Sequence, residues 1–277
     1  MSKSNSNGGL PASGPRPLLS IVTVGYNCAE TVGDTLRSIA SAFAATPDRA
    51  AVEYLFVDGG STDATLSIVG SFPETVDVVI SEPDDGMFDA MNKGAAAARG
   101  RYLWFVNADD MLESPASLEA VLEGLRKGPE VLYGDILIVD KNDLNHVKRY
   151  WRAMRRFSFV QLGWYPPHPG FLIAHDLFDE LGGFDLRYTI ASDIDFMTRA
   201  LLRKPRFEYV RVTLIRMRAG GASNTTFRAI AHANTECVDS LRRANVRFPW
   251  LVVALKVLRK AWQRSTRSWH PQPAVVE

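Results

Sequence analysis

The first half of the chain alternates short apolar runs with longer amphipathic segments. The apolar runs cover residues 18–24, 52–57, 76–81 and 102–106. The segments between them have the length and the alanine and leucine content of helices, and they cover residues 31–43, 62–72 and 87–98. Such alternation is typical of βαβ units. The pattern therefore predicts an α/β fold with a mainly parallel sheet that is flanked by helices.

The pattern changes in the second half. A helix is expected from Ser114, because serine suits the N-cap and the proline after it suits the first helical position. Further expected elements are short strands with irregular connections over 131–173, a helix over 193–202, a strand over 209–217, a glycine-rich loop over 219–224 and helical patterning to about residue 269. We therefore expect a catalytic domain over 18–224 and a C-terminal helical extension over 225–277. Residues 1–17 form a disordered tail in this prediction, since their Ser, Gly, Asn and Pro cannot offset the entropy lost on ordering.

The composition is that of a globular protein. Apolar residues make up 46% of the chain and charged residues 23%, which excludes global disorder. The start of the chain lacks the features of a secretion signal, and no run reaches the roughly 18–20 apolar residues that span a bilayer. Cys28 and Cys237 match no metal-ligand spacing and are expected to be reduced thiols. We therefore expect the chain in the cytoplasm.

Ligands of parallel α/β sheets bind at the carboxyl ends of the strands. In this chain those ends are at 25–27, 58–61, 82–86 and 107–110. Asp58 follows the second predicted strand, where its carboxylate either accepts a hydrogen bond from a base or ribose or only builds the turn. Asn107, Asp109 and Asp110 follow the fourth strand, and their oxygens suit a hard divalent cation that also binds phosphate. Acidic loops also occur without a ligand, so both alternatives stay open from these residues alone.

A second acidic pair, Asp193 and Asp195, opens a predicted helix. The helix dipole favours carboxylates in a first turn, which is a structural explanation for both residues. The functional alternative is a general base, which requires a carboxylate within reach of an acceptor hydroxyl. The spacing of the two residues does not decide between these explanations.

Five segments occur together in a fixed order: SIVTVGYN at 20–27, VDGGSTD at 57–63, DGMFDAMNKG at 85–94, NADD at 107–110 and SDID at 192–195. Together they resemble the motifs of family 2 glycosyltransferases over roughly residues 18–224. The segments 86–94 and 220–224 are most similar to bacterial enzymes that build exopolysaccharides, lipopolysaccharide or glycolipids. The resemblance implies a GT-A fold, a nucleotide-diphosphate sugar donor, a glycan or lipid-linked acceptor and inversion at the anomeric carbon.

The resemblance also implies roles for single residues. Asp193 matches the catalytic base, and Asp109 matches the metal-binding second acid of the DxD motif, which implies Mg²⁺ or Mn²⁺ with Asp110 sharing the task. Asn107 stands where many relatives have an Asp, and its neutral amide attracts a cation less. The donor-binding candidates are Thr23, Tyr26, Asn27, Asp58, Asp85, Lys93, Asn107 and Ala108. On the acceptor side the candidates are His168 and Trp164, for which a rigid turn and core packing are the alternatives. Uridine is the commonest base among similar enzymes, which favours UDP over GDP.

Two other function classes compete with an inverting glycosyltransferase. A sugar nucleotidyltransferase uses a related architecture but normally carries a basic, glycine-rich phosphate loop after its first strand, and residues 25–30 contain no basic side chain. A non-catalytic nucleotide-sugar-binding protein is the other alternative, because Asn107 weakens the metal site. Nucleic-acid binding is disfavoured, since the basic residues gather at the C-terminus and the rest of the chain is acidic.

The C-terminal segment is strongly basic. Residues 241–277 hold eight basic side chains against one acid. Residues 248–255 are mostly apolar but too few to span a bilayer. As a helix, this segment would place Leu251, Leu255, Leu258 and Trp262 on one face and Lys256, Arg259, Lys260 and Gln263 on the other. The pattern predicts peripheral contact of 248–264 with the inner face of the cell membrane, the alternative being that the apolar face packs on the catalytic domain.

Overall fold

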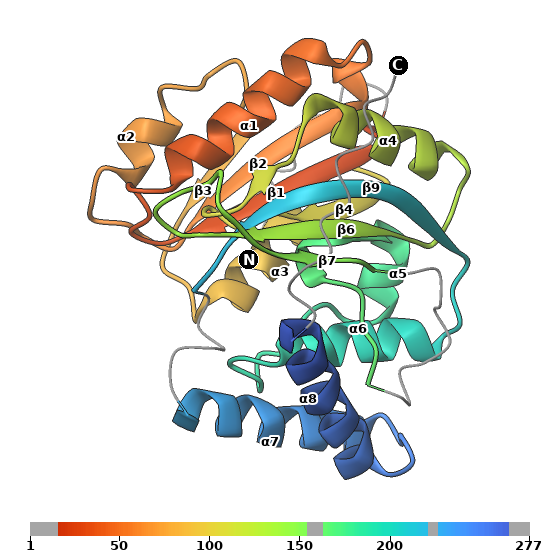
Figure 1. Cartoon of the computed structure of the whole chain (residues 1–277). Coiled ribbons are helices and arrows are strands. Elements are labelled where there is room, and N and C mark those ends of the chain that lie inside the picture. Colours follow the sequence, from red (N-terminus) through yellow and green to blue (C-terminus); the bar gives the residue numbers. More distant parts are fainter. Residues whose placement is uncertain (1–15, 154–162, 221–226, 266–277) are drawn as a thin grey trace, which may run out of the picture.

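The computed structural model describes residues 16–153, 163–220 and 227–265. Within these ranges, nine strands form a single sheet with helices on both of its faces (Figure 1). The strand order is β3-β2-β1-β4-β8-β6-β9-β5, and β7 pairs with β6 outside this path. The predicted α/β fold with flanking helices is confirmed.

Four parallel strands make up one side of the sheet. They are β1 (Leu19–Gly25), β2 (Val52–Asp58), β3 (Val78–Ser81) and β4 (Tyr102–Phe105). β1 and β2 are buried along almost their whole length, as expected for strands covered on both faces. In the register, Gly25 lies opposite Asp58, and Asp58 lies opposite Ser81. The loops after these strands therefore begin at the same level and form one carboxyl edge.

Helices pack on both faces of this sheet. On one face lie α1 (Val32–Ala45) and α4 (Pro115–Arg126). On the other lie α3 (Met87–Ala97), α5 (His175–Glu180) and α6 (Ser192–Leu202). Helix α3 approaches the sheet closely at Gly94, where a Cβ atom would lie 2.4 Å from Cγ1 of Val22. The helix expected over 62–72 is only α2 (Thr65–Val69), because Asp63 binds the backbone N–H and hydroxyl of Thr65 in a turn before it.

The other side of the sheet is mostly antiparallel. It contains β5 (Met111–Leu112), β6 (Val131–Val139), β7 (Val147–Trp151), β8 (Phe171–Ala174) and β9 (Phe207–Arg218). Strand β8 runs antiparallel to both β4 and β6, while β6 and β9 are parallel. Since β8 is antiparallel to β4, the start of β8 lies where β4 ends. The turn η3 (His168–Gly170), which precedes β8, therefore reaches the same carboxyl edge.

Two helices follow the sheet, α7 (Phe227–Arg243) and α8 (Pro249–Ser265). The continuous helical pattern expected to about residue 269 is interrupted, because Asn245 and Phe248 adopt positive φ angles of 55° and 61° before the proline that opens α8. A small apolar cluster joins both helices to the start of α6; it contains Ala191, Cys237, Val238, Leu241, Val246, Val252 and Val253. Among the described residues, no helix has the length and apolar character needed to cross a membrane.

Candidate active site

The loops after β1 and β2 hold each other in place at the carboxyl edge. Asn27 has a φ of 47°, and its side-chain oxygen accepts a hydrogen bond from the backbone N–H of Thr62 at 2.9 Å. In return, the backbone N–H of Asn27 donates to Oγ of Ser61 at 2.8 Å. Tyr26, which lies between β1 and this contact, keeps 62% of its surface exposed. Asn27 therefore supports the predicted donor site through the loop, and Tyr26 presents a ring on which a base could stack.

Asp58 has one of the two functions that the sequence left open, namely that of building the turn. Its Oδ2 accepts hydrogen bonds from the backbone N–H groups of Gly60 and Ser61, at 3.1 and 3.0 Å, and from Oγ of Ser81 at 2.8 Å. Its Oδ1 is buried and has no hydrogen-bond partner within the described part of the chain. One oxygen therefore builds the turn, and contact of the other with a donor stays a prediction. Thr23 is fully buried beside Tyr54, and its direct contact with the donor stays a prediction.

Lys93 fixes the loop before α3. Its Nζ donates to the carbonyl of Pro83 at 2.8 Å and forms ion pairs with Glu82 at 3.1 Å and Asp89 at 3.2 Å. These carboxylates raise the pKa of Lys93. Asp85 is exposed, and its backbone N–H donates to the same Asp89. The structure thus gives Lys93 a structural role, and direct contact of Lys93 or Asp85 with the donor remains a prediction.

The NADD segment after β4 contains several oxygens without partners. The side-chain oxygen of Asn107 and both carboxylate oxygens of Asp110 are buried and lack a hydrogen bond of full geometry among the described residues, although the side chain of Asn107 and the backbone of Arg218 lie near enough to lower the pKa of Asp110. Asp110 is only 1% exposed, and burial together with the charge of Asp109 raises its pKa well above the usual value. Burial also raises the pKa of Asp109. Ala108 packs tightly against Gly25: a Cβ atom added to Gly25 would lie 3.0 Å from the Cβ atom of Ala108.

This donor set fits a hard divalent cation. A cation would supply the partner that the buried oxygens lack and would stabilise the ionised carboxylates. Within the described ranges, no group of three or more His, Cys, Asp or Glu side chains is placed to hold a metal ion. A bound Mg²⁺ or Mn²⁺ would therefore have to complete its shell with water or with phosphate oxygens of a ligand.

Arg218 lies beside Asp109 and Asp110, a position that the sequence analysis did not predict. It ends β9, and β5, which directly follows Asp110, pairs with β9. Its guanidinium contacts Asp34 in the first turn of α1. Its positive charge lowers the pKa values of Asp109 and Asp110, against the larger effect of burial. Only the pairing of strands about a hundred positions apart brings this charge to the site.

Asp193 lies at the start of α6 and faces His168. Its Oδ1 accepts the backbone N–H of Ile194 at 2.7 Å. Burial raises its pKa, while the nearby side chains of His168 and Lys256 act in the opposite direction. The ring of His168 stacks on Phe105, the last residue of β4, with ring centroids 6.4 Å apart. The two predicted residues are thus brought together at the carboxyl edge, although they come from separate elements.

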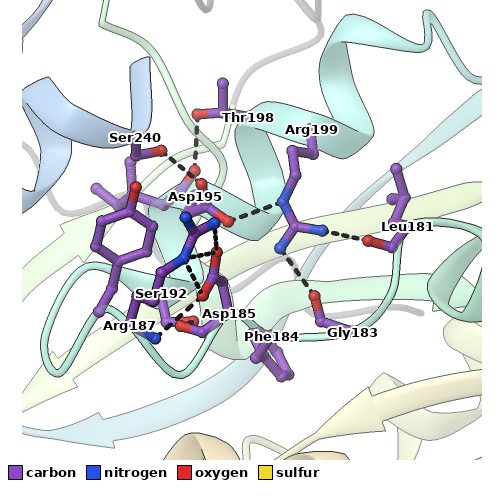
Figure 2. A network of polar contacts seen from close by, with 12 residues as sticks. Leu181, Gly183, Phe184, Asp185, Arg187, Ser192, Asp195, Thr198, Arg199 and Ser240 are labelled. Carbon is purple, nitrogen blue, oxygen red and sulfur yellow. Dashed lines mark hydrogen bonds and ion pairs between the residues drawn. The ribbon is translucent and has the colours of Figure 1, made fainter. Parts of the chain in front are cut away.

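Asp195, only two positions further on, is fully engaged in a polar network (Figure 2). Its Oδ2 accepts Nε of Arg199 at 2.8 Å, and its Oδ1 accepts Oγ of Ser240, from α7, at 2.8 Å. Arg199 also donates to the carbonyls of Leu181 and Gly183. Asp195 is 5% exposed and has no oxygen left for a substrate. The structure therefore separates the two acids: Asp195 is structural, and Asp193 is the candidate base.

Trp164, predicted on the acceptor side, is a core residue. It is 3% exposed, and its ring packs edge-on against Tyr133 with centroids 6.1 Å apart. A side chain buried to this extent cannot stack on a sugar without rearrangement. The structure therefore favours the packing alternative for Trp164.

The match to known proteins covers most of this architecture. Residues 20–184 match the sequence model of glycosyl transferase family 2. The chain belongs to this family. Membership makes it an enzyme that transfers glycosyl groups, which favours the glycosyltransferase hypothesis over the nucleotidyltransferase and the non-catalytic alternatives.

Several characterised and uncharacterised relatives are similar in sequence. An uncharacterized glycosyltransferase of Mycobacterium tuberculosis is 31% identical over 191 residues, which is 67% of this chain and 70% of that protein. A PGL/p-HBAD biosynthesis glycosyltransferase of Mycobacterium bovis is 29% identical over 223 residues, covering 76% and 80%. The succinoglycan biosynthesis protein ExoO of Rhizobium meliloti is 31% identical over 171 residues, covering 61% and 45%.

Two solved structures share the fold. The crystal structure of S. aureus TarS 1–349 in complex with UDP-GlcNAc has a TM-score of 0.64 at 17% identity, covering 90% of this chain and 74% of that one. The mannosyltransferase PcManGT from Pyrobaculum calidifontis, in complex with GDP-Man and Mn²⁺, has a TM-score of 0.60 at 19% identity, covering 92% and 74%. The expected GT-A fold is thereby confirmed.

Proposed function

We propose that this family 2 enzyme transfers a sugar, with inversion, from a nucleotide-diphosphate sugar to a hydroxyl of a glycan or lipid-linked acceptor. The observation that carries the proposal is the set of unpartnered, buried oxygens at one sheet edge, with Asp193 and His168 at the same edge. TarS is named with UDP-GlcNAc and PcManGT with GDP-Man, which supports a sugar nucleotide as donor. We expect a uridine nucleotide before a guanosine nucleotide.

The donor would lie across the ends of β1, β2 and β4. The free Oδ1 of Asp58 accepts a hydrogen bond from the base, and Tyr26 stacks on its ring. Asp109 and Asp110, with the amide oxygen of Asn107, would hold Mg²⁺ or Mn²⁺. When bound, the cation neutralises charge that develops on the departing diphosphate. Arg218 adds a fixed positive charge beside these acids.

The transfer requires one displacement. Asp193 accepts the proton of the acceptor hydroxyl as its oxygen forms a bond to the anomeric carbon. At the same time the bond from that carbon to the diphosphate oxygen breaks, and the nucleoside diphosphate leaves on the opposite face. One base on the acceptor side suffices for inversion. Asp195 is not needed, since both of its oxygens are engaged.

Helix α8 would bring the enzyme to a lipid-linked acceptor by contacting the membrane surface. Five large apolar side chains on and before this helix are exposed, namely Phe248, Trp250, Leu251, Val257 and Leu258. Arg247 lies against the ring of Phe248, and Arg242 against that of Trp250, with centroid distances of 5.1 and 5.4 Å. Exposed apolar side chains next to basic ones suit the surface of an anionic membrane. Peripheral contact with the inner face of the cell membrane would bring the site to a lipid-linked acceptor.

Lys256 does not lie on the face of α8 that was predicted to contact the membrane. Lys256, expected beside the lipid headgroups, lies on the inward face, and its Nζ donates to Sγ of Cys237 at 3.0 Å. The reason is that α8 packs on α7 through Val252 and Val253, and Lys256 is one turn after Val252. The side chains from 259 onward lie outside the described part of the chain, so the expected positions of Arg259, Lys260, Trp262 and Gln263 stay predictions.

A thermal-shift screen tests the donor assignment. UDP-GlcNAc and GDP-Man would each be added with Mn²⁺, with Mg²⁺ and with a chelator, because a ligand that binds the native state raises the melting temperature. We expect one sugar nucleotide to raise it, more so with cation. Asp58→Asn should reduce this shift, whereas Asp176→Asn, which removes an exposed carboxylate on α5, should leave it intact. If neither nucleotide changes the melting temperature, a screen of the remaining common sugar nucleotides decides whether any donor binds.

A further inference from the structure

The segment that leads into Asp193 is held by a carboxylate from another helix. Glu236, in α7, is 8% exposed. Its Oε1 accepts the backbone N–H and the hydroxyl of Thr189, both at 2.9 Å. Its Oε2 accepts the backbone N–H groups of Ile190 and Ala191, at 2.9 and 2.8 Å. Three successive backbone donors directly before α6 are therefore bound by one side chain.

Glu236 compensates only in part for a helix cap that the local sequence lacks, because Ala191 alone among its three backbone donors belongs to the start of α6. The residue at the N-cap position of α6 is Ala191, whose side chain cannot accept a hydrogen bond. The N–H groups at a helix start need acceptors, and a negative charge there is favoured by the helix dipole. Burial would raise the pKa of Glu236, but its hydrogen bonds from the backbone outweigh this effect and lower it, so the carboxylate is charged. Its Oε1 also lies 3.0 Å from Nε2 of the exposed His232.

The same face of α7 also reaches α6 itself. Ser240, one turn after Glu236, donates to Asp195, as Figure 2 shows. Cys237 lies between them in the apolar cluster that includes Ala191. Positions 236, 237 and 240 lie on one side of a helix. The contacts therefore bracket Asp193: Glu236 holds the backbone just before it, and Ser240 holds the side chain just after it.

We propose that Glu236 is a positioning residue for the transfer reaction, which fixes the backbone of 189–191 and thereby holds the carboxylate of Asp193 at His168. The inference rests on the proposed function of Asp193 as the base. It makes α7 a part of the catalytic centre and not only the start of a membrane-binding extension. A displacement of the base by about 1 Å is enough to slow a reaction strongly, whereas donor binding at β1, β2 and β4 does not depend on this segment.

Glu236→Gln is the direct test. The amide keeps the size of the side chain, but its NH₂ group faces backbone donors and leaves at least one of them without an acceptor. We expect kcat to fall roughly 10- to 100-fold, while the donor KM and the donor-induced thermal shift stay within about twofold of the wild type. The amide protons of Thr189, Ile190 and Ala191 should exchange faster with solvent. The matched control is Asp239→Asn in the same helix, which contacts the hydroxyl of Tyr188 but not the backbone of 189–191.

The outcomes separate this inference from the proposed function. If Glu236→Gln loosens 189–191 but keeps the wild-type kcat, Glu236 is only structural and the inference is wrong. If Asp193→Asn itself keeps its turnover, the proposed base is wrong, whatever Glu236 does. If Glu236→Gln fails to fold, Glu236→Asp replaces it: the charge stays but the carboxylate is one methylene shorter, and the same loss of kcat at unchanged donor KM is expected. A wild-type kcat in that variant would equally overturn the inference.

Discussion

Asp→Asn changes at Asp193 and Asp195 test the roles assigned to the two acids. The change at Asp193 should slow turnover, and the change at Asp195 should lower stability. At Asp193 the amide oxygen can still accept the N–H of Ile194, which is 2.7 Å from Oδ1. Burial already disfavours the charge there and raises the pKa of the acid. The amide should therefore change the free energy of unfolding by less than about 1 kcal/mol. Turnover should fall by about 10²- to 10⁴-fold, since the amide cannot take the acceptor proton.

At Asp195 the expected cost is in stability. Removing one partner of a buried ion pair typically costs about 3–5 kcal/mol. Arg199 is a quarter exposed and keeps two carbonyl acceptors, and the amide oxygen can still accept from Ser240. These remaining contacts reduce the expected loss to about 2–3 kcal/mol. For a chain of this size, that corresponds to a melting temperature lower by roughly 4–12 °C.

Two measurements on each variant decide the matter. The first is single-turnover transfer from the donor that the thermal-shift screen identifies, at a temperature well below unfolding, and the second is the melting temperature without ligand. We expect Asp193→Asn to be slow but stable, and Asp195→Asn to be less stable with turnover within about tenfold of the wild type. The reverse pattern would refute the assignment of roles, and so would turnover within threefold of wild type in Asp193→Asn.

Three further outcomes are expected. Asp109→Ala should abolish the extra thermal shift that Mn²⁺ gives to the donor; if a chelator leaves wild-type turnover unchanged, no cation takes part. Turnover should decline as the pH falls through the raised pKa of Asp193, because only the ionised carboxylate accepts a proton, and Lys256→Met should move this decline to higher pH by removing a nearby positive charge; identical pH profiles would exclude an influence of Lys256. The double change Leu251→Ser and Leu258→Ser should weaken sedimentation with anionic vesicles at moderate salt and spare the donor shift, and equal binding by both proteins would argue against docking through α8.

The sequence by itself determined the parallel half of the fold and where along the chain to look for the candidate donor site. Alternating apolar runs and amphipathic segments are local patterns, and they predicted β1 to β4 and α1 and α3 within a few residues. Parallel strands place their carboxyl ends at one edge, so Asp58 and the NADD segment could be assigned to a common site before any contact was known. Asp110 and Asn107 do have oxygens without partners there, as a ligand site requires.

Only the tertiary structure decided which residues complete the acceptor side. Asp193 and Asp195 have the same side chain and lie in the same helical turn. They differ because Arg199 and Ser240 donate hydrogen bonds to Asp195 and not to Asp193. Arg218 reaches the acidic pair through strand pairing, and Glu236 reaches the start of α6 through helix packing. Apart from the i,i+4 pair of Asp195 with Arg199, these contacts join positions that lie 45 or more residues apart, so no local periodicity encodes them. Tertiary contacts also decide which side of α8 is buried, because Val252 and Val253 pack against α7.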